Sequence, residues 1–312
     1  MYNFNTIIKI QSLIAKYNDK SLIIRDEIMD CLKLGETKDK KMIVLMESEK
    51  CPYSILEIGR LREITFRSVG EGTGKEFDLD EYDEIYKHIV LWDNEELEIV
   101  GSYRLGEIGD IIEKYGVGRI YNAELFNFSD KFIEMIKNSI ELGRAFVQAK
   151  YWGTYALDYL WQGIGAYLSN FTNVKYLWGA VSISHSFPSL AKTILINYHK
   201  KWYEGEKGLV LAKEQFKSDL MDDFYSKSKL LGKNPQEDFM TMKSELKKLD
   251  VSCPVLLRKY VDLCEYGGTQ FLDFGVDKSF SNSIDCFIIV DTEKIKLDFK
   301  KRYYTNFEEI SS

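Results

Sequence analysis

The sequence predicts an α+β protein in which helices cover a mixed β-sheet. Segments with apolar residues every three to four positions, typical of helices, intermix with short apolar runs typical of buried strands. The two kinds of segment follow no strict β-α-β rhythm, which favours a mixed sheet over a parallel one. The 312 residues are 45% hydrophobic and 14% aromatic and include only 4 Pro, the composition of a folded chain.

The first part of the chain predicts amphipathic helices and then the first strands. Apolar residues at helical spacing indicate one or two helices within residues 5–33. We expect their apolar faces to pack on the core, with contact to a membrane surface as the alternative. The elements that follow are a strand at 42–46, a helix at 55–68, strands at 88–92 and 99–105, and a short helix or loop at 108–115.

The second part of the chain carries most of the long helices. The expected elements are helices at 130–139, 157–168, 189–203, 239–249 and 254–264 and strands at 140–147, 174–183 and 285–290. Ser186 or Ser189 is available to cap the helix at 189–203. We divide the chain into N-terminal helices (1–38), a core (39–210) and a helical C-terminal extension (211–312) whose final strand packs on the core.

Charge and residue usage exclude several functional classes. The net charge of −7 argues against a nucleic-acid binder, which normally carries a basic surface. The 5 Cys show no C-x-x-C spacing and there are only 3 His, so we expect no disulfide framework and no metal site. Neither a signal peptide nor a run of about 18 apolar residues is evident. We therefore expect a cytoplasmic protein, with peripheral contact to the inner membrane as an addition.

Charged residues interrupt two apolar strands. Arg104 lies in the strand at 99–105, and Glu141 and Arg144 lie in the strand at 140–147. Strand alternation puts Glu141 and Arg144 on opposite faces of the sheet. Burial of such charges is costly unless they are paired. The network that we expect joins three arginines with three carboxylates, namely Arg62, Arg104, Arg144, Glu141, Asp80 and Asp83. The residues alone do not decide whether this network is structural or poises an acid or base in a site.

Nine segments, in one order, resemble a single family. They are EIGRLREITFR, the Gly-rich loop at 70–74, LDEYD, HIVLWD, IVGSYRL, LFNFSDKF, ELGRAFV, LDYLWQGIGAYL and YLWGAVSIS. Together they are similar to the GNAT-fold acyltransferases that carry the name haemolysin and include the N-acyltransferases of ornithine-lipid and glycine-lipid synthesis. The likeness is greatest to the glycine-lipid type and covers about residues 50–210. It continues more weakly through PVLLRKYVDL and the final DCFIIVD. Acyl-homoserine-lactone synthases are more distant relatives.

The resemblance implies a three-layer α/β/α fold whose bent sheet opens between two strands. The phosphopantetheine arm of an acyl donor enters this opening, and backbone N–H groups of the strand at 140–147 polarise its thioester. An amine then attacks the thioester directly, and Glu141 is the expected base, acting through a water. Asp80 and Asp83 shape the acceptor side.

The remaining implied site residues bind carboxylates or the acyl donor. Three arginines hold the protein's carboxylates or the carboxylate of an amino-acid acceptor, namely Arg62, Arg104 and Arg144. The substrate-binding residues are Phe66, Gly143, Val147, Trp92 and Phe146. For Trp92 and Phe146, which would wall the acyl chain, a plain core role is the alternative.

One departure from the fold's usual pattern concerns the acyl donor. CoA-using members carry Q/R-x-x-G-x-G/A after this strand, whereas residues 148–154 read QAKYWGT, and Gly163 and Gly165 lie inside a predicted helix. The resemblance then favours acyl carrier protein over acyl-CoA as donor, with no tightly bound cofactor. A basic dock for this acidic partner would use scattered lysines, namely Lys150, Lys175, Lys192, Lys200 and Lys201.

The resulting hypothesis is an N-acyltransferase of aminolipid synthesis. It would move a long, 3-hydroxylated acyl chain from acyl carrier protein to the α-amine of an amino acid, glycine first and ornithine second. A CoA-dependent N-acetyltransferase of small molecules is one alternative. A non-catalytic, haemolysin-like lipid-binding protein is an alternative of another class.

Overall fold

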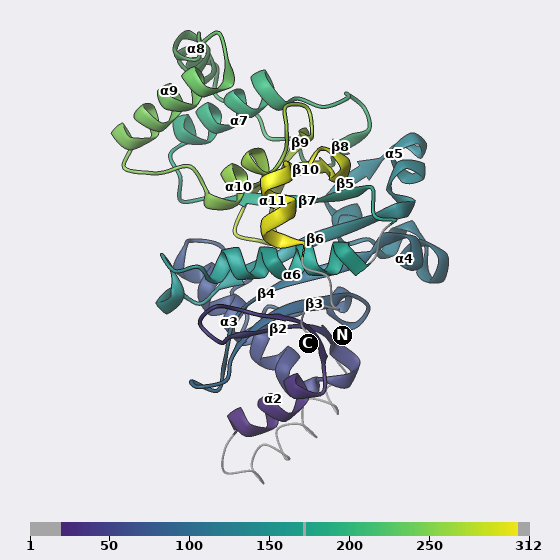
Figure 1. Ribbon diagram of the computed structural model, residues 1–312. Helices are drawn as coiled ribbons and strands as arrows, with labels where there is room; N and C mark the ends of the chain where they lie inside the picture. Colours follow the sequence, from purple (N-terminus) through teal and green to yellow (C-terminus); the bar gives the residue numbers. More distant parts are fainter. Residues whose placement is uncertain (1–19, 171–172, 305–312) are drawn as a thin grey trace.

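An eight-stranded sheet lies between two layers of helices in the computed structural model, which describes residues 20–170 and 173–304 (Figure 1). Its order is β1-β2-β3-β4-β6-β7-β10-β9, and only β6 and β7 pair in parallel among these neighbours. The strands are β1 (Leu32–Glu36), β2 (Met42–Glu47), β3 (Lys87–Asp93), β4 (Glu98–Glu107), β6 (Ser139–Val147), β7 (Tyr176–Ile183), β9 (Thr269–Asp277) and β10 (Ser283–Asp291). A small second sheet pairs β5 (Phe126–Phe128) with β8 (Val210–Ala212).

The helices cover both faces of the large sheet. They are α2 (Lys20–Met29), α3 (Pro52–Ser68), α4 (Ile108–Tyr115), α5 (Asp130–Met135), α6 (Ala156–Asn170), α7 (Ser189–Tyr203), α8 (Leu220–Lys229), α9 (Pro235–Lys248), α10 (Val255–Leu263) and α11 (Leu297–Tyr303). The main core lies under α6, α7 and α10, and two smaller cores lie on the opposite face, under α2 and α3 and around α4 and α5. The predicted α+β class with three layers is confirmed.

Several elements differ from the predictions. Leu32, which we expected on a helix, begins β1, because residues 32–36 form a hairpin with β2 and bury Leu34 in the main core. Residues 136–139 leave the predicted helix, and Ser139 starts β6. Neither predicted serine caps α7, whose N-cap is Pro188 without a side-chain bond. Besides β1, five elements were not predicted, namely β5, β8, β9, α8 and α11. The predicted helices before residue 20 lie outside the described residues.

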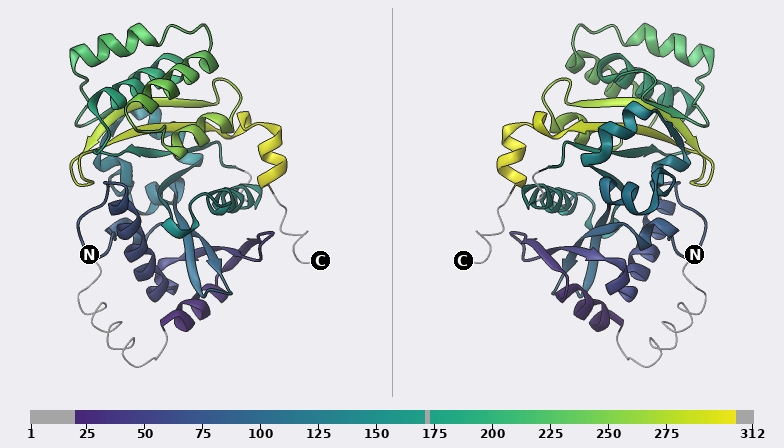
Figure 2. Two further views of the ribbon diagram at one scale, coloured as in Figure 1. Left: turned by 90° about the vertical axis from the view of Figure 1, so that its left-hand side faces the viewer. Right: turned by 90° about the vertical axis from the view of Figure 1, so that its right-hand side faces the viewer.

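The sheet twists strongly and separates in its middle. β6 and β7 share three register pairs, Ser139 with Tyr176 through Glu141 with Trp178. Beyond them, β6 pairs with β4 alone and β7 with β10 alone. Figure 2 shows the twist, since β9 and β10 run across the view while β3 and β4 run down it. No helix within the described residues is long and apolar enough to cross a membrane.

A glycine marks the point where β6 and β7 separate. A Cβ atom on Gly179 would collide with the carbonyl oxygen of Leu142 on the neighbouring strand. We expect Gly179→Ala to lower the free energy of unfolding by about 1–3 kcal/mol, because overpacking must move one strand. Urea unfolding measures this. Gly118→Ala is the control, since a Cβ atom there meets nothing within 4 Å, and equal effects of the two changes would contradict the prediction.

Candidate active site

A bulge in β6 shapes the middle of the sheet. Ser102 of β4 pairs with Phe146 and Arg104 pairs with Gly143, so β6 carries one extra residue in this interval. Arg144 has a φ of 47°, and a bulge leaves its extra residue outside the hydrogen-bonded ladder. Arg144 therefore turns toward Tyr121, on the face of Glu141. The predicted opposite placement of these two side chains is wrong because strict alternation fails at a bulge.

The three arginines converge on the loop between α3 and β3. Arg62 donates from Nη1 to Asp83 Oδ1 at 2.8 Å and from Nη2 to Asp83 Oδ2 at 2.9 Å. Arg104 Nη1 lies 2.6 Å from Asp80 Oδ1 and 3.3 Å from Asp83 Oδ1. Arg144 Nη2 lies 3.6 Å from Asp80 Oδ2. Asp78, which the predicted network lacked, faces Arg62 and Arg144 at 3.0 and 3.4 Å.

The acidic loop owes its shape to a capping box. The Asp80 carboxylate accepts from the backbone N–H groups of Tyr82 and Asp83, and the Asp83 carboxylate accepts from the N–H of Asp80. This D-x-x-D exchange starts the short 3-10 helix Glu81–Glu84. The same two carboxylates are thereby aimed at the arginines, so a local sequence pattern presents both acids to partners on α3 and β4.

Burial and pairing decide the charges in this network. Burial alone would raise the pKa of Asp83, but Arg62 and Arg104 outweigh it and hold that pKa well below its usual range. His88 is fully buried beside Asp83, and burial lowers its pKa to about 4. Asp83 is therefore ionised and His88 neutral at pH 7.

Glu141 lies apart from the ion pairs. Its Oε2 accepts from the hydroxyl of Tyr86, and its Oε1 accepts from the backbone N–H of Asn122 at 2.9 Å and from the Asn122 amide at 2.5 Å. The side chain is 1% exposed, and burial raises its pKa. Tyr86 connects Glu141 to the ion pairs. Its hydroxyl donates to Glu141, and the Arg104 guanidinium lies 5.3 Å from the centre of its ring.

A cavity of about 70 Å³ lies where β6 and β7 separate. Its apolar wall includes Tyr103, Leu142, Val181 and Tyr260, which belong to the main core under α6 and α10. Its polar wall lies on the opposite face of the sheet and includes Tyr121, Asn122, Arg144, Ser182, Asp277 and Asp285. The cavity therefore joins the two faces of the sheet through the gap between the strands.

The predicted site residues divide between this cavity and the structure behind it. Phe66, Gly143 and Arg144 line the cavity. Phe66 packs edge-on against Phe280, with ring centroids 5.2 Å apart. The others do not line it. Arg62, Arg104, Asp80, Asp83 and Glu141 form the charged support behind the polar wall, Trp92 and Phe146 lie in the core under α3, and Val147 packs against the main core.

Sequence reasoning missed several cavity residues. Asp285 stands out because it begins the apolar run DCFIIV, the same signal that pointed to Arg104 and Glu141. Tyr121 and Asn122 gave no such signal, because they lie in a segment without periodicity that reaches the site only through the fold. Within residues 20–170 and 173–304, no group of three or more His, Cys, Asp or Glu residues is placed to hold a metal ion.

The glycines of α6 serve packing. A Cβ atom on Gly163 would lie 2.6 Å from Ile89 Cγ2, and one on Gly165 would collide with the carbonyl of Tyr303. Both residues lie inside α6, as predicted, where backbone N–H groups bond within the helix. The segment between β6 and α6 instead forms the short 3-10 helix Ala149–Tyr151. The segment between β6 and α6 contains one glycine, Gly153, whose backbone lies in the left-handed region with a φ of 77°.

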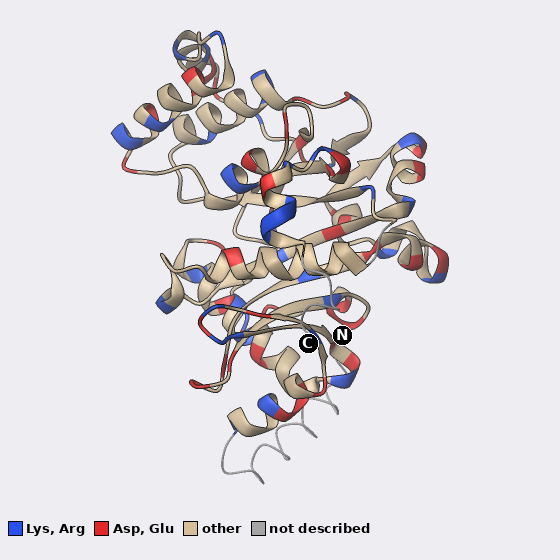
Figure 3. Ribbon diagram, in the orientation of Figure 1, with Lys and Arg blue, Asp and Glu red and all other residues tan. Residues whose placement is uncertain are grey.

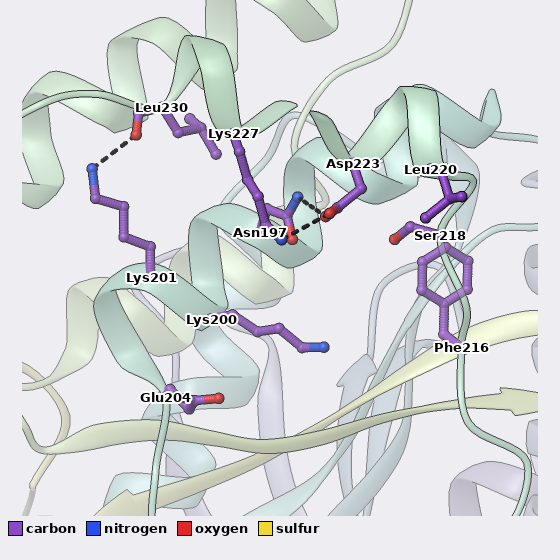
Figure 4. Close-up of a pocket in the computed structure, with 10 residues that line it drawn as sticks. All are labelled: Asn197, Lys200, Lys201, Glu204, Phe216, Ser218, Leu220, Asp223, Lys227 and Leu230. Carbon is purple, nitrogen blue, oxygen red and sulfur yellow. Dashed lines mark hydrogen bonds and ion pairs between the residues drawn. The ribbon is translucent and has the colours of Figure 1, made fainter. Parts of the chain in front are cut away.

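A larger cavity of about 560 Å³ lies between α7 and α8 (Figure 4). Most of its charged groups are already paired. Lys227 Nζ and Asn197 Nδ2 bind the Asp223 carboxylate at 2.7 and 3.0 Å, and Lys201 donates to the carbonyl of Leu230 at 2.9 Å. Figure 3 shows both basic and acidic positions along α8 and α9, in this part of the molecule. The cavity between α7 and α8 does not lie at a gap between strands, where backbone groups are free of sheet partners. The cavity between β6 and β7 does lie at such a gap, so it is the candidate site.

The chain is similar to proteins of known activity. The family model of the acetyltransferase (GNAT) domain matches residues 61–162. The glycine N(alpha)-acyltransferase of Bacteroides thetaiotaomicron is 30% identical over 301 residues, which cover 92% of this chain and 88% of that relative. The protein of the same name from Phocaeicola vulgatus is 29% identical over 299 residues, which cover 91% and 90%.

Solved structures with a similar fold include two CoA-dependent acyl-homoserine lactone synthases. BjaI is 12% identical with a TM-score of 0.40, and the match covers 87% of this chain and 90% of BjaI. MesI is 11% identical with a TM-score of 0.40, and the match covers 84% and 94%.

Proposed function

Since the chain belongs to the family of the glycine N(alpha)-acyltransferases and carries a GNAT domain, we propose that it transfers a long, 3-hydroxylated fatty acyl chain from acyl carrier protein to the α-amine of glycine. The observation that carries this proposal is the cavity between β6 and β7, which has an apolar wall on one face of the sheet and a charged wall on the other. The acyl chain needs an apolar environment and the amino acid needs a charged one. The two must meet at the thioester carbon atom, where the new bond forms.

The bulge in β6 supports the thioester side of the reaction. N–H groups that a bulge frees from the ladder are available to bind the thioester carbonyl oxygen as it gains negative charge. Gly143, Arg144 and Ala145 of this segment all line the cavity. The amine nitrogen attacks the thioester carbon, the C–S bond breaks, and the phosphopantetheine thiolate leaves and takes up a proton. No covalent bond to the protein is needed.

Arg144 supports binding of the acceptor carboxylate. Its side chain is 12% exposed and lines the cavity, and its contacts with Asp78 and Asp80 are long, at 3.4 and 3.6 Å. A guanidinium on a cavity wall suits a bidentate carboxylate. Glycine is proposed ahead of ornithine because the two relatives that align with most of this chain are glycine N(alpha)-acyltransferases.

The donor is proposed to be acyl carrier protein rather than CoA. A CoA pyrophosphate is normally held by a glycine-rich loop at a helix N-terminus. The segment before α6 has one glycine, and the two glycines within α6 are used for packing. Of the predicted docking lysines, Lys150 pairs with Glu98, and Lys192 donates to the carbonyl of His185. The surface that would receive the carrier protein therefore stays a prediction.

The proton acceptor that the sequence predicts is Glu141. Glu141 does not line the cavity. It lies behind Asn122, which does line the cavity and whose side-chain amide donates to the Glu141 carboxylate. A proton from the acceptor amine would reach Glu141 only through such a neighbour or a water.

The experiment is acyl transfer by the purified protein, followed by mass spectrometry. We expect N-acylglycine from 3-hydroxyacyl carrier protein and glycine, a much slower reaction when acyl-CoA replaces the carrier protein, and little N-acylornithine when glycine and ornithine compete at equal concentration. Expression in a bacterium without aminolipids should add the same product to its lipid extract. A folded protein that forms no N-acyl amino acid from either donor would contradict the proposal.

A further inference from the structure

We propose that Asp285, on β10, receives the ammonium group of the acceptor and takes its proton in the transfer reaction. This inference rests on the proposed function and assigns its base to β10, whose run DCFIIVD resembles the family only weakly. It is carried by the place of the side chain in the cavity, by the bonds that it does not make and by the charges that surround it.

The fold aims Asp285 at the gap between the strands. Its neighbours along β10, Ile284 and Cys286, point into the main core, so alternation turns Asp285 to the opposite face of the sheet. In the ladder it lies opposite Ser182 of β7. Both Asp285 and Ser182 line the cavity, together with Arg144 of β6.

The Asp285 carboxylate is buried without a bond to hold it. The residue is 7% exposed, and no hydrogen bond or ion pair with another described residue satisfies its side chain. Asp277, its acidic neighbour in the same cavity, is different: its Oδ1 accepts from Ser279 and from the N–H of Phe280. Glu141 is also saturated, by Tyr86 and Asn122. Asp285 is therefore the carboxylate of the cavity that remains available to a ligand.

Titratable groups on four neighbouring segments interact with Asp285. Asp277 lies on the paired strand β9, Glu71 on the loop after α3, and Arg144 on β6, while the Tyr121 hydroxyl faces it from the segment before α5. Burial, then Asp277 and Glu71, raise the pKa of Asp285 to about 8 against the opposing effect of Arg144. A base is most effective when its pKa lies near the working pH.

The arrangement complements an amino-acid zwitterion. Arg144 offers a cation for the acceptor carboxylate. On the other side of the gap, Asp285 offers an anion for the acceptor's ammonium once it has ionised, which its pKa of about 8 places near neutral to mildly alkaline pH. Asp285 takes one proton from the ammonium and leaves a neutral amine. The amine nitrogen forms its bond to the thioester carbon, the C–S bond breaks, and the second proton of the nitrogen goes to the departing thiolate. Asp285 then releases its proton to solvent, so the cycle gives an amide, a thiol and one proton.

The test compares Asp285→Asn with Glu141→Gln and Asp291→Asn. We expect Asp285→Asn to lower kcat by about 10²–10⁴-fold, the usual contribution of a general base. In the wild-type protein, the rate should rise with pH and level off above about 8, whereas in Asp285→Asn it should keep rising toward the pKa of the acceptor's own amine. Asp291→Asn is the matched control, because Asp291 ends the same strand but does not line the cavity; its side chain caps the next turn and faces Lys294 at 3.8 Å. The kcat of this variant should stay near the wild-type value.

Thermal unfolding separates lost chemistry from lost structure. A raised pKa means that Asp285 binds its proton more tightly in the folded state, so wild-type stability falls as pH rises from about 4 to about 8. An asparagine side chain does not ionise, so the Asp285→Asn variant does not lose stability for this reason as the pH rises. We expect Asp285→Asn to melt higher than wild type at pH 9 and nearly equal to it at pH 4.

The outcomes are distinguishable. A variant Asp285→Asn that melts as expected, has lost turnover and shows the changed pH profile, beside an Asp291→Asn variant with nearly wild-type kcat, supports the inference. An Asp285→Asn variant with wild-type kcat and pH profile overturns it, and then the base is Glu141 if Glu141→Gln is inactive. A wild-type protein without activity on any donor would instead overturn the proposed function.

Discussion

Replacement of Asp83 by alanine is expected to destabilise the protein by about 3–5 kcal/mol, because it leaves Arg62 and Arg104 buried without their shared partner. Arg62 is 0% exposed and bonds both oxygens of Asp83, and Arg104 is 1% exposed. A typical domain is stable by only 5–15 kcal/mol. The variant should therefore unfold at a much lower urea concentration or accumulate as insoluble protein.

Urea unfolding of the wild type and the variant measures this loss. Asp262→Ala is the matched control: its partner Arg258 is exposed, at 3.2 Å, and exposed pairs contribute about 0–1 kcal/mol. Because the pKa of Asp83 is depressed in the folded state, the stability that it contributes is present above about pH 4 and is lost as the pH falls below its unfolded pKa. A variant as stable as the control at pH 7 would show that the network does not hold the loop.

Replacement of Arg144 by lysine is expected to raise the KM for glycine about 100-fold, which corresponds to ~3 kcal/mol, the upper range for a hydrogen bond to a charged group. Lysine keeps the positive charge but loses the planar fork that binds both carboxylate oxygens. It also loses the contact of the guanidinium over Tyr121, 4.9 Å from the ring centroid.

Initial rates at varied glycine concentration measure this effect. Arg119→Lys is the control, because Arg119 pairs with Glu81 and lies over Tyr82 but does not line the cavity. The KM for the acyl donor should change little in both variants. An unchanged KM for glycine in Arg144→Lys would mean that another group binds the acceptor carboxylate.

Periodicity predicted the long elements well because they carry one apolar face each. The helix at 55–68 and the strands at 88–92 and 99–105 occur as α3, β3 and β4. The rule that buried charges must be paired also predicts the association of Arg62 and Arg104 with Asp83. Short elements such as β8 and α11 carry too few residues for a periodic signal and form only because they pack against distant segments.

The amino-acid sequence by itself determined the α+β class, the apolar strands and the need of the buried arginines for acidic partners, because these depend on residue type and on spacing along one element. The tertiary structure decided which face Arg144 occupies, through the bulge in β6, and where β6 and β7 part. It also decided that Asp285, 141 positions after Arg144 in the chain, shares a cavity with it. Such neighbours are set by strand order and twist, which no local pattern of residues encodes.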